Sequence, residues 1–419
     1  MRSIIAWKIF RWFLASSLIC VSAMMLLPQS QAAELTDLYQ AEVDAAQSQT
    51  QWQQAAMAAV LVKLTGSEAI LTQGAIAAEL KNSANYIRQF QQVQVQGRNL
   101  MQVQLDQQKI TALLQQQQIA IWGSRRPDLL LWLTEKTPEQ SKFVLEAEHP
   151  LRQALAAQAK QRGLSFVYPM YDVDDLAVVS EAQLVAGDWS GLTIAAARYQ
   201  PDQVLSLLVE HRVDANGQAS LSLIRQQQVE GAVVQQEYTA ADWHSVVQQL
   251  TQALAAELAA QYAVKVTTMD TGAGQQLQLT IDGVGSLTDL VALQKLFGSM
   301  LAVRKFSLLE YQAPTAILQL ELAATASDFY RALALESQLK PVAAATASAA
   351  SAQAAGELSQ GPAVAQAPVV DDLTAAEQAM AEALGVENVP ATPTIESGIV
   401  STPVTMPLVE ATHYQFSRR

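Results

Sequence analysis

The densest group of side chains able to do chemistry is a run of aspartates at Asp172, Asp174 and Asp175. Carboxylates at alternate positions can bind a hard cation such as Mg²⁺ or Ca²⁺, or work as a general acid and base. The run lacks the spacing, the central glycine and the final glutamate of an EF-hand loop. Aspartate is also favoured at the start of a helix, where it caps the first turn and interacts with the helix dipole. We therefore expect a helix cap or a solvated loop, with cation binding as the alternative left open.

The segment Trp122–Pro127 is the best candidate for a contact site. The guanidinium groups of Arg125 and Arg126 suit a carboxylate or another small anion, and the indole of Trp122 suits a sugar ring or a cation. The alternative is a junction between domains, in which Pro127 fixes the chain, Trp122 packs inside and the arginines pair with some of the many acids. We favour the junction and keep Trp122, Arg125 and Arg126 as the possible contact site.

The remaining motif candidates point to structural roles. Gly283-Val284-Gly285 lies between a predicted strand and a predicted helix, as in a dinucleotide-binding fingerprint. Thr288 stands where that fingerprint needs its third glycine, so we interpret the segment as a turn. The four histidines form no pattern typical of a metalloprotease, and a catalytic triad assembled from distant residues is the enzymatic alternative left open. The sequence therefore assigns no catalytic residue, no cofactor and no metal ligand.

The first 32 residues predict export. Arg2, Lys8 and Arg11 form a short basic head, which is followed by an apolar run over 12–27 and by small residues before the predicted cut. This pattern is typical of a secretory signal peptide cleaved after Ala32, and a retained membrane anchor is the alternative. The apolar run is shorter than the ~20 residues that a bilayer core requires, so we expect no integral membrane span after cleavage. We predict a periplasmic location in a Gram-negative cell.

Charge and cysteine content exclude several classes of function. The formal net charge of −13 becomes −16 when the three basic residues of the predicted signal are removed. So acidic a chain is repelled by nucleic-acid phosphates and by anionic lipid, and we expect no nucleic-acid binding. The only cysteine, Cys20, lies within the predicted signal, so the mature chain would have no disulfide and no thiol nucleophile. An exported chain without disulfides depends on ordinary hydrophobic cores.

Hydrophobic periodicity divides the rest of the chain into three folded units and a tail. The first unit, 33–124, is predicted to be a small α+β domain, with helices at 51–64, 76–80 and 107–117 and a hairpin formed by 87–95 and 100–105. The second unit, 125–263, opens with a continuous apolar run at 128–133, which suits a strand covered on both faces. Its later segments alternate between helix and strand patterns and end in a long amphipathic helix at 243–262. This indicates a mixed-sheet α/β sandwich.

The third unit, 264–340, is predicted to be ferredoxin-like. Its order of strand, helix, strand, strand and helix matches a split βαβ unit, and 264–267 is a possible extra strand. The last segment, 341–419, is rich in Ala, Pro and Gln, and its scattered prolines and low aromatic content predict a disordered tail. Within it, 373–384 could form a short helix and 414–419 could bind a partner, while a tail without a partner is the alternative.

The stretch from Leu38 to about Tyr262 resembles the bacterial domain-of-unknown-function family 2066 (DUF2066). The resemblance is carried by a combination of short motifs: Leu38-Tyr39, VKLTG at 62–66, WGSRRP at 122–127, RG at 162–163, PMYDVDD at 169–175, and RY at 198–199 with Asp202. The resemblance implies an exported envelope protein and supplies no activity and no catalytic residue. The third unit and the tail lie outside it.

Together these observations favour a non-enzymatic periplasmic protein whose small α/β modules dock on another envelope protein. Two alternatives stay open: a binding module for a small anion or a cell-wall glycan at Trp122–Pro127, and a hydrolase with a dispersed site. An exposed apolar patch would favour the partner hypothesis. A deep polar pocket lined by paired carboxylates, or by a serine and a histidine, would favour the enzyme. The sequence does not name the partner.

Overall fold

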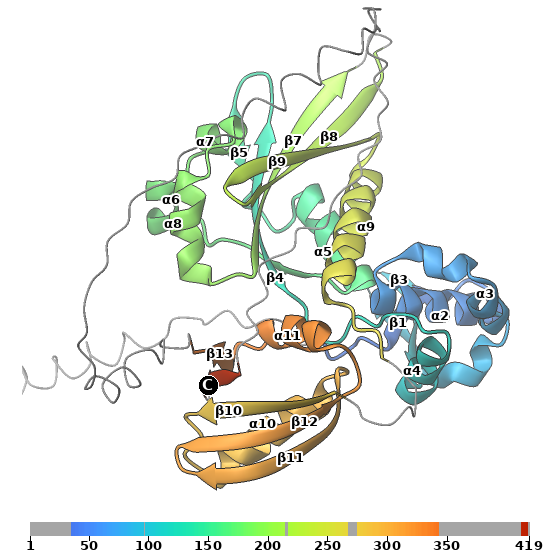
Figure 1. Cartoon of the computed structure of the whole chain (residues 1–419). Helices are drawn as coiled ribbons and strands as arrows, with labels where there is room; N and C mark the ends of the chain where they lie inside the picture. The colour runs from blue at the N-terminus through green and yellow to red at the C-terminus, as the bar shows by residue number, and fades with distance from the viewer. Residues whose placement is uncertain (1–34, 96, 214–216, 267–274, 343–411, 418–419) are drawn as a thin grey trace, which may run out of the picture. The chain divides into compact units, whose positions relative to one another are not determined.

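The computed structural model describes residues 35–95, 97–213, 217–266, 275–342 and 412–417 (Figure 1). They all belong to one compact unit, which combines the chain up to Ala343 with the segment from Pro403 to Arg419. The predicted signal peptide, the possible helix at 373–384 and most of the predicted tail lie outside the described residues. Within the described ranges, every helix is too short or too polar to span a bilayer.

The N-terminal part forms an antiparallel sheet and the predicted helices, with one additional strand. Strands β1 (Gln40–Asp44), β3 (Arg98–Leu105) and β2 (Ile87–Val95) lie side by side in that order. The helices are α2 (Gln49–Thr65), α3 (Gly74–Leu80) and α4 (Gln107–Gln116), with short 3-10 helices η2 (Glu68–Thr72) and η3 (Ser83–Tyr86). Ala41, Val103 and Leu105 face α2 in one buried cluster. Strand β1 was not predicted, because its sequence is short and mostly polar and only its alternate residues reach this core.

The middle part is built on a mixed sheet, as predicted. Its main path is β5 (Ser141–Phe143), β4 (Asp128–Lys136), β7 (Gln203–Val213), β8 (Ala219–Val229) and β9 (Ala232–Ala240). Strand β6 (Ser165–Val167) pairs with β4 beside the start of that strand. Strand β4 runs parallel to β6 and β7, and the remaining pairs are antiparallel. The structure therefore confirms the α+β and α/β fold class.

Helices cover both faces of the middle sheet. Leu129, Leu131 and Leu133 of β4 enter a cluster with α5 (Pro150–Arg162) and α9 (Trp243–Tyr262). The alternate residues Leu130 and Trp132 enter a second cluster with α7 (Glu181–Ala186) and α8 (Ser190–Tyr199), and the short helix α6 (Val173–Val178) packs on α8. Because side chains alternate across a strand, this arrangement confirms that 128–133 is covered on both faces.

The end of α2 meets α9 at a glycine. Gly66 has φ 71° and ends α2 in the left-handed conformation, where its N–H donates to the Val62 carbonyl at 2.7 Å. A Cβ at this position would lie 2.3 Å from the Cβ of Ala259 and 2.4 Å from the carbonyl oxygen of Ala255. Only glycine combines this backbone conformation with so close an approach. The N-terminal and middle parts are therefore in direct contact here.

The C-terminal part is a ferredoxin-like sheet that contains two strands that were not predicted. The order is β11 (Val303–Gln312), β12 (Thr315–Leu322), β10 (Gln276–Asp282), β14 (His413–Phe416) and β13 (Leu339–Pro341). Helices α10 (Leu287–Ser299) and α11 (Ala326–Ala334) complete its core. Strand β14 runs parallel to β10 and antiparallel to β13. It thus separates the first strand of the βαββαβ unit from the fourth, which would otherwise be neighbours.

Strand β14 corrects the prediction for 341–419. Tyr414 and Phe416 are 4% and 3% exposed, and both belong to the core cluster of the C-terminal sheet. Pro341 lies within β13, so the folded part also extends into the start of the predicted tail. The possible strand at 264–267 is reduced, within the described residues, to a single bridge between Val264 and Ile121.

Candidate functional site

The segment Trp122–Pro127 runs through the interior of the protein. Trp122 is 1% exposed and Arg126 is fully buried. The backbone N–H of Trp122 donates to the carbonyl of Leu64, near the end of α2, at 2.7 Å. Immediately after the segment, β4 begins at Asp128. The segment therefore has the geometry of a junction between the N-terminal and middle parts.

Arg126 is held by neutral groups. Its guanidinium carbon lies 3.5 Å from the centroid of the Trp122 ring. Its Nη2 donates to the carbonyl oxygens of Lys63 at 2.9 Å and Trp122 at 3.2 Å, while Nε and Nη1 make no hydrogen bond with any described residue. Burial lowers the pKa of Arg126 well below its ordinary value, and the neighbouring Tyr39 acts in the opposite direction. The side chain fixes the junction and is not presented to a ligand at the surface.

Arg125 takes a different position. Its side chain is 28% exposed, and its Nε lies 3.1 Å from a carboxylate oxygen of Glu336, whose side chain is 2% exposed. Glu336 follows α11, so this ion pair links the junction to the C-terminal part. Of the three candidate contact residues, only Arg125 reaches solvent. The structure does not bring Trp122, Arg125 and Arg126 together as one exposed surface.

The aspartate run starts helix α6. The carboxylate of Asp172 accepts a hydrogen bond from the N–H of Asp175 at 3.1 Å and lies 2.7 Å from the Arg198 guanidinium. The hydrogen bond from Arg198 is the main cause that lowers the pKa of Asp172. Asp175 is 1% exposed and accepts from the hydroxyl of Tyr199 at 2.6 Å and the N–H of Tyr171 at 2.9 Å. The two carboxylates are thus engaged in holding the loop against α8.

Two histidines distant in sequence meet at one carboxylate. The Nε2 atoms of His149 and His211 lie 3.5 Å and 2.7 Å from oxygens of Glu135, and both rings contact Trp243 edge-on. The N–H of Leu151 donates to Nδ1 of His149, which places the ring proton on Nε2, the atom that faces Glu135. The described residues contain no group of three or more His, Cys, Asp or Glu arranged to hold a metal ion. The cluster connects the starts of α5 and α9 to β4 and β7.

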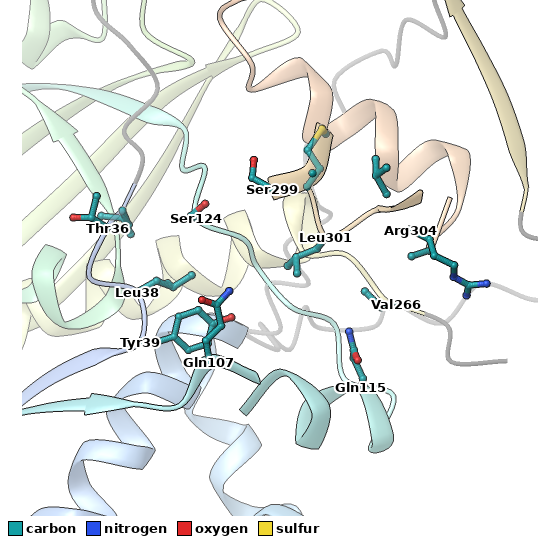
Figure 2. A pocket seen from close by; sticks show the side chains of 15 residues that line it. Thr36, Leu38, Tyr39, Gln107, Gln115, Ser124, Val266, Ser299, Leu301 and Arg304 are labelled. Atoms are coloured by element: carbon teal, nitrogen blue, oxygen red, sulfur yellow. The ribbon is translucent and has the colours of Figure 1, made fainter. Parts of the chain in front are cut away.

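A cleft of about 780 Å³ opens beside the junction (Figure 2). One side is formed by the chain before β1 and by α4, and the other by the end of α10 and the loop that leads to β11. Figure 2 shows Leu38, Tyr39 and Gln107 on the first side and Leu301 and Arg304 on the second. Ser124 of the junction also contributes to the lining.

The cleft combines aliphatic surface with neutral hydrogen-bonding groups. Burial raises the pKa of Tyr39, whose hydroxyl shares a 3.1 Å hydrogen bond with Thr111, so the phenol stays protonated. The described residues that line the cleft include Arg304 and no carboxylate or histidine. Arg304 also lies 3.4 Å from Glu321. A lining of this kind suits recognition of a neutral or anionic ligand through hydrogen bonds and apolar contact.

The largest exposed apolar side chains near the aspartate run gather on α6 and α8. We define the α6–α8 patch as four residues with these exposed fractions: Met170 55%, Val173 83%, Leu176 46% and Ile194 64%. Large apolar side chains this exposed are costly when they are contiguous, and contiguous patches mark interaction sites.

The contacts between the two helices bring the patch residues of α6 and α8 near one another. Asp172 at the start of α6 pairs with Arg198 near the end of α8, and Gly191 near the start of α8 lies against the end of α6, so the helices are antiparallel. Leu176 is one turn after Asp172, and Ile194 is one turn before Arg198, which places both on facing turns. Arg198 also donates to the sulfur of Met170 at 3.6 Å. The arginine thus lies at the edge of the apolar surface.

Comparison with known proteins adds one family match. A family model described as a domain of unknown function (DUF8605) matches residues 32–123. The match ends inside the junction, next to the predicted boundary of the first unit. No curated protein and no solved structure was found to match the chain.

Sequence reasoning missed both the cleft and the α6–α8 patch. Leu38 and Leu301 are far apart in the chain, so no spacing connects the two sides of the cleft. For the patch a weak signal existed. In α8 the buried positions Leu192, Ala195 and Tyr199 share one face, and Ile194 lies outside that face.

Proposed function

We propose that this chain is a non-enzymatic periplasmic protein of a Gram-negative envelope and that it acts by binding another envelope protein. The α6–α8 patch is the observation that carries this proposal, because folded monomers rarely expose contiguous large aliphatic side chains without a partner. The export pattern of the first 32 residues and the resemblance to DUF2066 support the envelope location.

The rim of the patch indicates the chemistry of the partner. The side chain of Asp174 is 87% exposed, and its carboxylate lies 4.0 Å from Arg198, which is already paired with Asp172. A complementary surface therefore has an apolar centre and a basic residue opposite Asp174. The strongly acidic composition of the chain favours association with a basic partner in the same way.

Site-specific crosslinking in intact cells tests this proposal. A photo-activatable residue at Val173 is expected to capture one defined envelope protein, and Ile194→Asp in the same chain should abolish that product. Val213→Asp is the matched control, because Val213 is 70% exposed but lies at the end of β7 outside the patch. Ile194→Asp should also reproduce the cellular phenotype of a deletion while its melting temperature stays unchanged. An undiminished crosslink in Ile194→Asp would refute docking at the patch.

The cleft supports a second function, the binding of a small neutral or anionic ligand such as a cell-wall glycan. Its size lies within the range of small-molecule sites, and Arg304 supplies a cation beside neutral donors. Purified peptidoglycan fragments are the probe. Gly298 lines the cleft, and a Cβ added to it would meet no atom within 4 Å, so Gly298→Phe would fill the cleft without a backbone clash. Fragment binding that survives Gly298→Phe, or no binding at millimolar concentration, would refute this function.

A further inference from the structure

Strand β11 is a long open edge of the C-terminal sheet (Figure 1). It pairs with β12 on one side, and the order β11-β12-β10-β14-β13 leaves its other side without a strand among the described residues. The opposite edge, β13, is three residues long and ends in Pro341, which cannot donate a hydrogen bond to an added strand. The edge at β11 is ten residues long, and an unpaired edge of this kind exposes backbone groups that can accept a further strand.

The hydrogen bonds of the neighbouring strand show which backbone groups of β11 face outward. The N–H of Leu322 in β12 donates to the carbonyl of Gln275, just before β10. Because the direction of these bonds alternates along a strand, the even-numbered residues of β12 bond to β10 and the odd-numbered residues bond to β11. Phe306 and Leu308 lie opposite two even-numbered residues, at 320 and 318. Their N–H and C=O groups therefore point away from the sheet and have no backbone partner in the described part of the chain.

The exposed part of this edge carries large apolar side chains. Three of them belong to β11, with these exposed fractions: Leu308 43%, Leu309 53% and Tyr311 38%. The start of α10 adds two more, one turn apart: Leu287 76% and Val291 56%. The helix packs on β11, and the hydroxyl of Tyr311 donates to the carbonyl of Val284, just before α10, at 3.2 Å. The start of α10 thus adds apolar surface near the end of β11.

Charges of opposite sign lie on the two sides of the apolar centre of β11. On the face of the sheet that is turned away from the core, Lys305, Ser307 and Glu310 follow one another. Each lies opposite a successive odd-numbered residue of β12, since Leu309 is the extra residue of a bulge. Lys305 and Glu310 are exposed, and neither forms an ion pair with a described residue. This face of the strand is therefore basic at one end and acidic at the other, with Ser307 midway.

Such an order is complementary to itself when two copies of the strand lie antiparallel. A two-fold axis at Ser307 brings each Lys305 opposite Glu310 of the other copy, whereas parallel strands in register would bring like charges together. The same axis pairs Phe306 of one copy with Leu308 of the other, the two residues whose backbone groups point outward. Apolar side chains then lie near the axis and charged side chains at the rim, as in specific protein interfaces.

We infer that β11 pairs antiparallel with β11 of a second copy of this chain, about a two-fold axis at Ser307, so that two C-terminal sheets join into one. The backbone of Phe306 and Leu308 provides the hydrogen bonds, and the two pairs of Lys305 with Glu310 fix the register. This surface is separate from the α6–α8 patch, and the inference does not depend on the proposed function, in which the partner is a different protein.

A single cysteine tests the position of the axis in the full chain. In an antiparallel pair of this kind the two Cα atoms of residue 307 lie about 4.5 Å apart, within the range that a disulfide spans. Ser307→Cys should therefore form a covalent dimer under mild oxidation. Gln319→Cys is the matched control, because Gln319 lies opposite Ser307 on β12 and its two copies would be about 14 Å apart, or three strand spacings. Both variants also carry Cys20→Ser, which removes the only natural thiol.

Sedimentation equilibrium measures the association itself. The natural chain should be a dimer at high micromolar concentration, and Leu308→Lys should be a monomer, because it places a charge at the middle of the edge. Val234→Lys is the control, since Val234 is 52% exposed on β9, an edge strand of the middle sheet. Thermal unfolding checks that Leu308→Lys is folded.

An exchange of charges tests the register without touching an apolar residue. Glu310→Lys places two lysines opposite each other at both ends of the seam and should raise the dissociation constant of the dimer about ten-fold. Lys305→Glu added to the same chain should recover most of this loss, because unlike charges then face each other again. If Leu308→Lys is destabilised, this exchange at two exposed positions decides.

Three results would overturn the inference: a monomer at millimolar concentration, equal disulfide formation by Ser307→Cys and Gln319→Cys, or a double variant that associates as weakly as Glu310→Lys. Ile194→Asp distinguishes this test from that of the proposed function. That substitution should leave the dimer intact, and Leu308→Lys should leave the crosslink at Val173 intact, so either site can fail without the other.

Discussion

Replacing Phe416 by alanine is expected to destabilise the C-terminal sheet, although this residue lies close to the end of the chain. Phe416 is 3% exposed and packs in the cluster that contains Tyr414 and Leu339. Truncating a buried phenylalanine costs about 3–5 kcal/mol, through lost transfer free energy and the cavity left behind. We expect about 3 kcal/mol, because a short terminal strand can relax. For a unit of ~60–100 residues this lowers the melting temperature by about 12–24 °C.

Scanning calorimetry of the full chain measures this loss, and fluorescence assigns it. No tryptophan follows Trp243 in the sequence. Tryptophan fluorescence therefore reports unfolding of the N-terminal and middle parts, and the C-terminal sheet contributes no tryptophan signal. The expected result is a shifted calorimetric transition with an unchanged tryptophan transition. Gln415→Ala is the matched control on the same strand, since Gln415 is exposed and should change stability by no more than about 0.5 kcal/mol.

Gly283, which follows β10, offers an independent test of the contact between β10 and β14. It has φ 84°, and a Cβ there would lie 2.4 Å from the carbonyl oxygen of Phe416. Gly283→Ala should therefore displace β14, and the double variant with Phe416→Ala should lose less than the sum of the single losses. Fully additive losses, or a Phe416→Ala protein that melts like Gln415→Ala, would refute the packing of β14.

Further predictions concern the junction, a buried acid and a helix contact. In denaturant unfolding, Trp122→Ala should cost about 3–5 kcal/mol and Arg125→Ala about 1–2 kcal/mol, and the reverse order would contradict the junction. Burial raises the pKa of Asp202 from 3.8 to about 6, so its contribution to stability is present at low pH and is lost as pH rises through 6. Asp202→Asn should remove this pH dependence of the unfolding free energy, which is worth about 1–3 kcal/mol. Urea titrations at about pH 4.5 and 7.5 measure it, and an equal pH dependence in the variant and the natural chain would contradict the prediction. Gly191→Ala should cost about 1–3 kcal/mol, because its Cβ would lie 2.0 Å from the Val178 carbonyl oxygen, and unchanged thermal unfolding would show that α6 and α8 are not in tight contact.

The parts of the fold that local pattern determines were predicted from the sequence. The apolar run at 128–133 forms β4, and both faces of this strand are covered. Its side chains alternate between the two faces, so an unbroken apolar run contributes to two cores. The long amphipathic helix predicted at 243–262 is α9, because its apolar residues recur at helical spacing on one face.

The parts that depend on distant partners could not be predicted. Strand β14 is four residues long, so the alternation of Tyr414 and Phe416 is too short to predict its pairing with β10 and β13. The same holds for Arg126, because arginine is rarely buried and only the folded junction supplies its carbonyl partners and the Trp122 ring.

The segment that precedes β14 is attached to the C-terminal sheet at both of its ends. The N–H of Val342 donates to the carbonyl of His413 at 2.9 Å, so the chain leaves and re-enters the sheet at neighbouring points. The segment 343–411 therefore connects two paired strands of one sheet, β13 and β14. A single proteolytic cut within it should yield two fragments that elute together under native conditions and separate in denaturant. Longer inserts there should be tolerated as well, because the entropy of closing a loop grows only with the logarithm of its length.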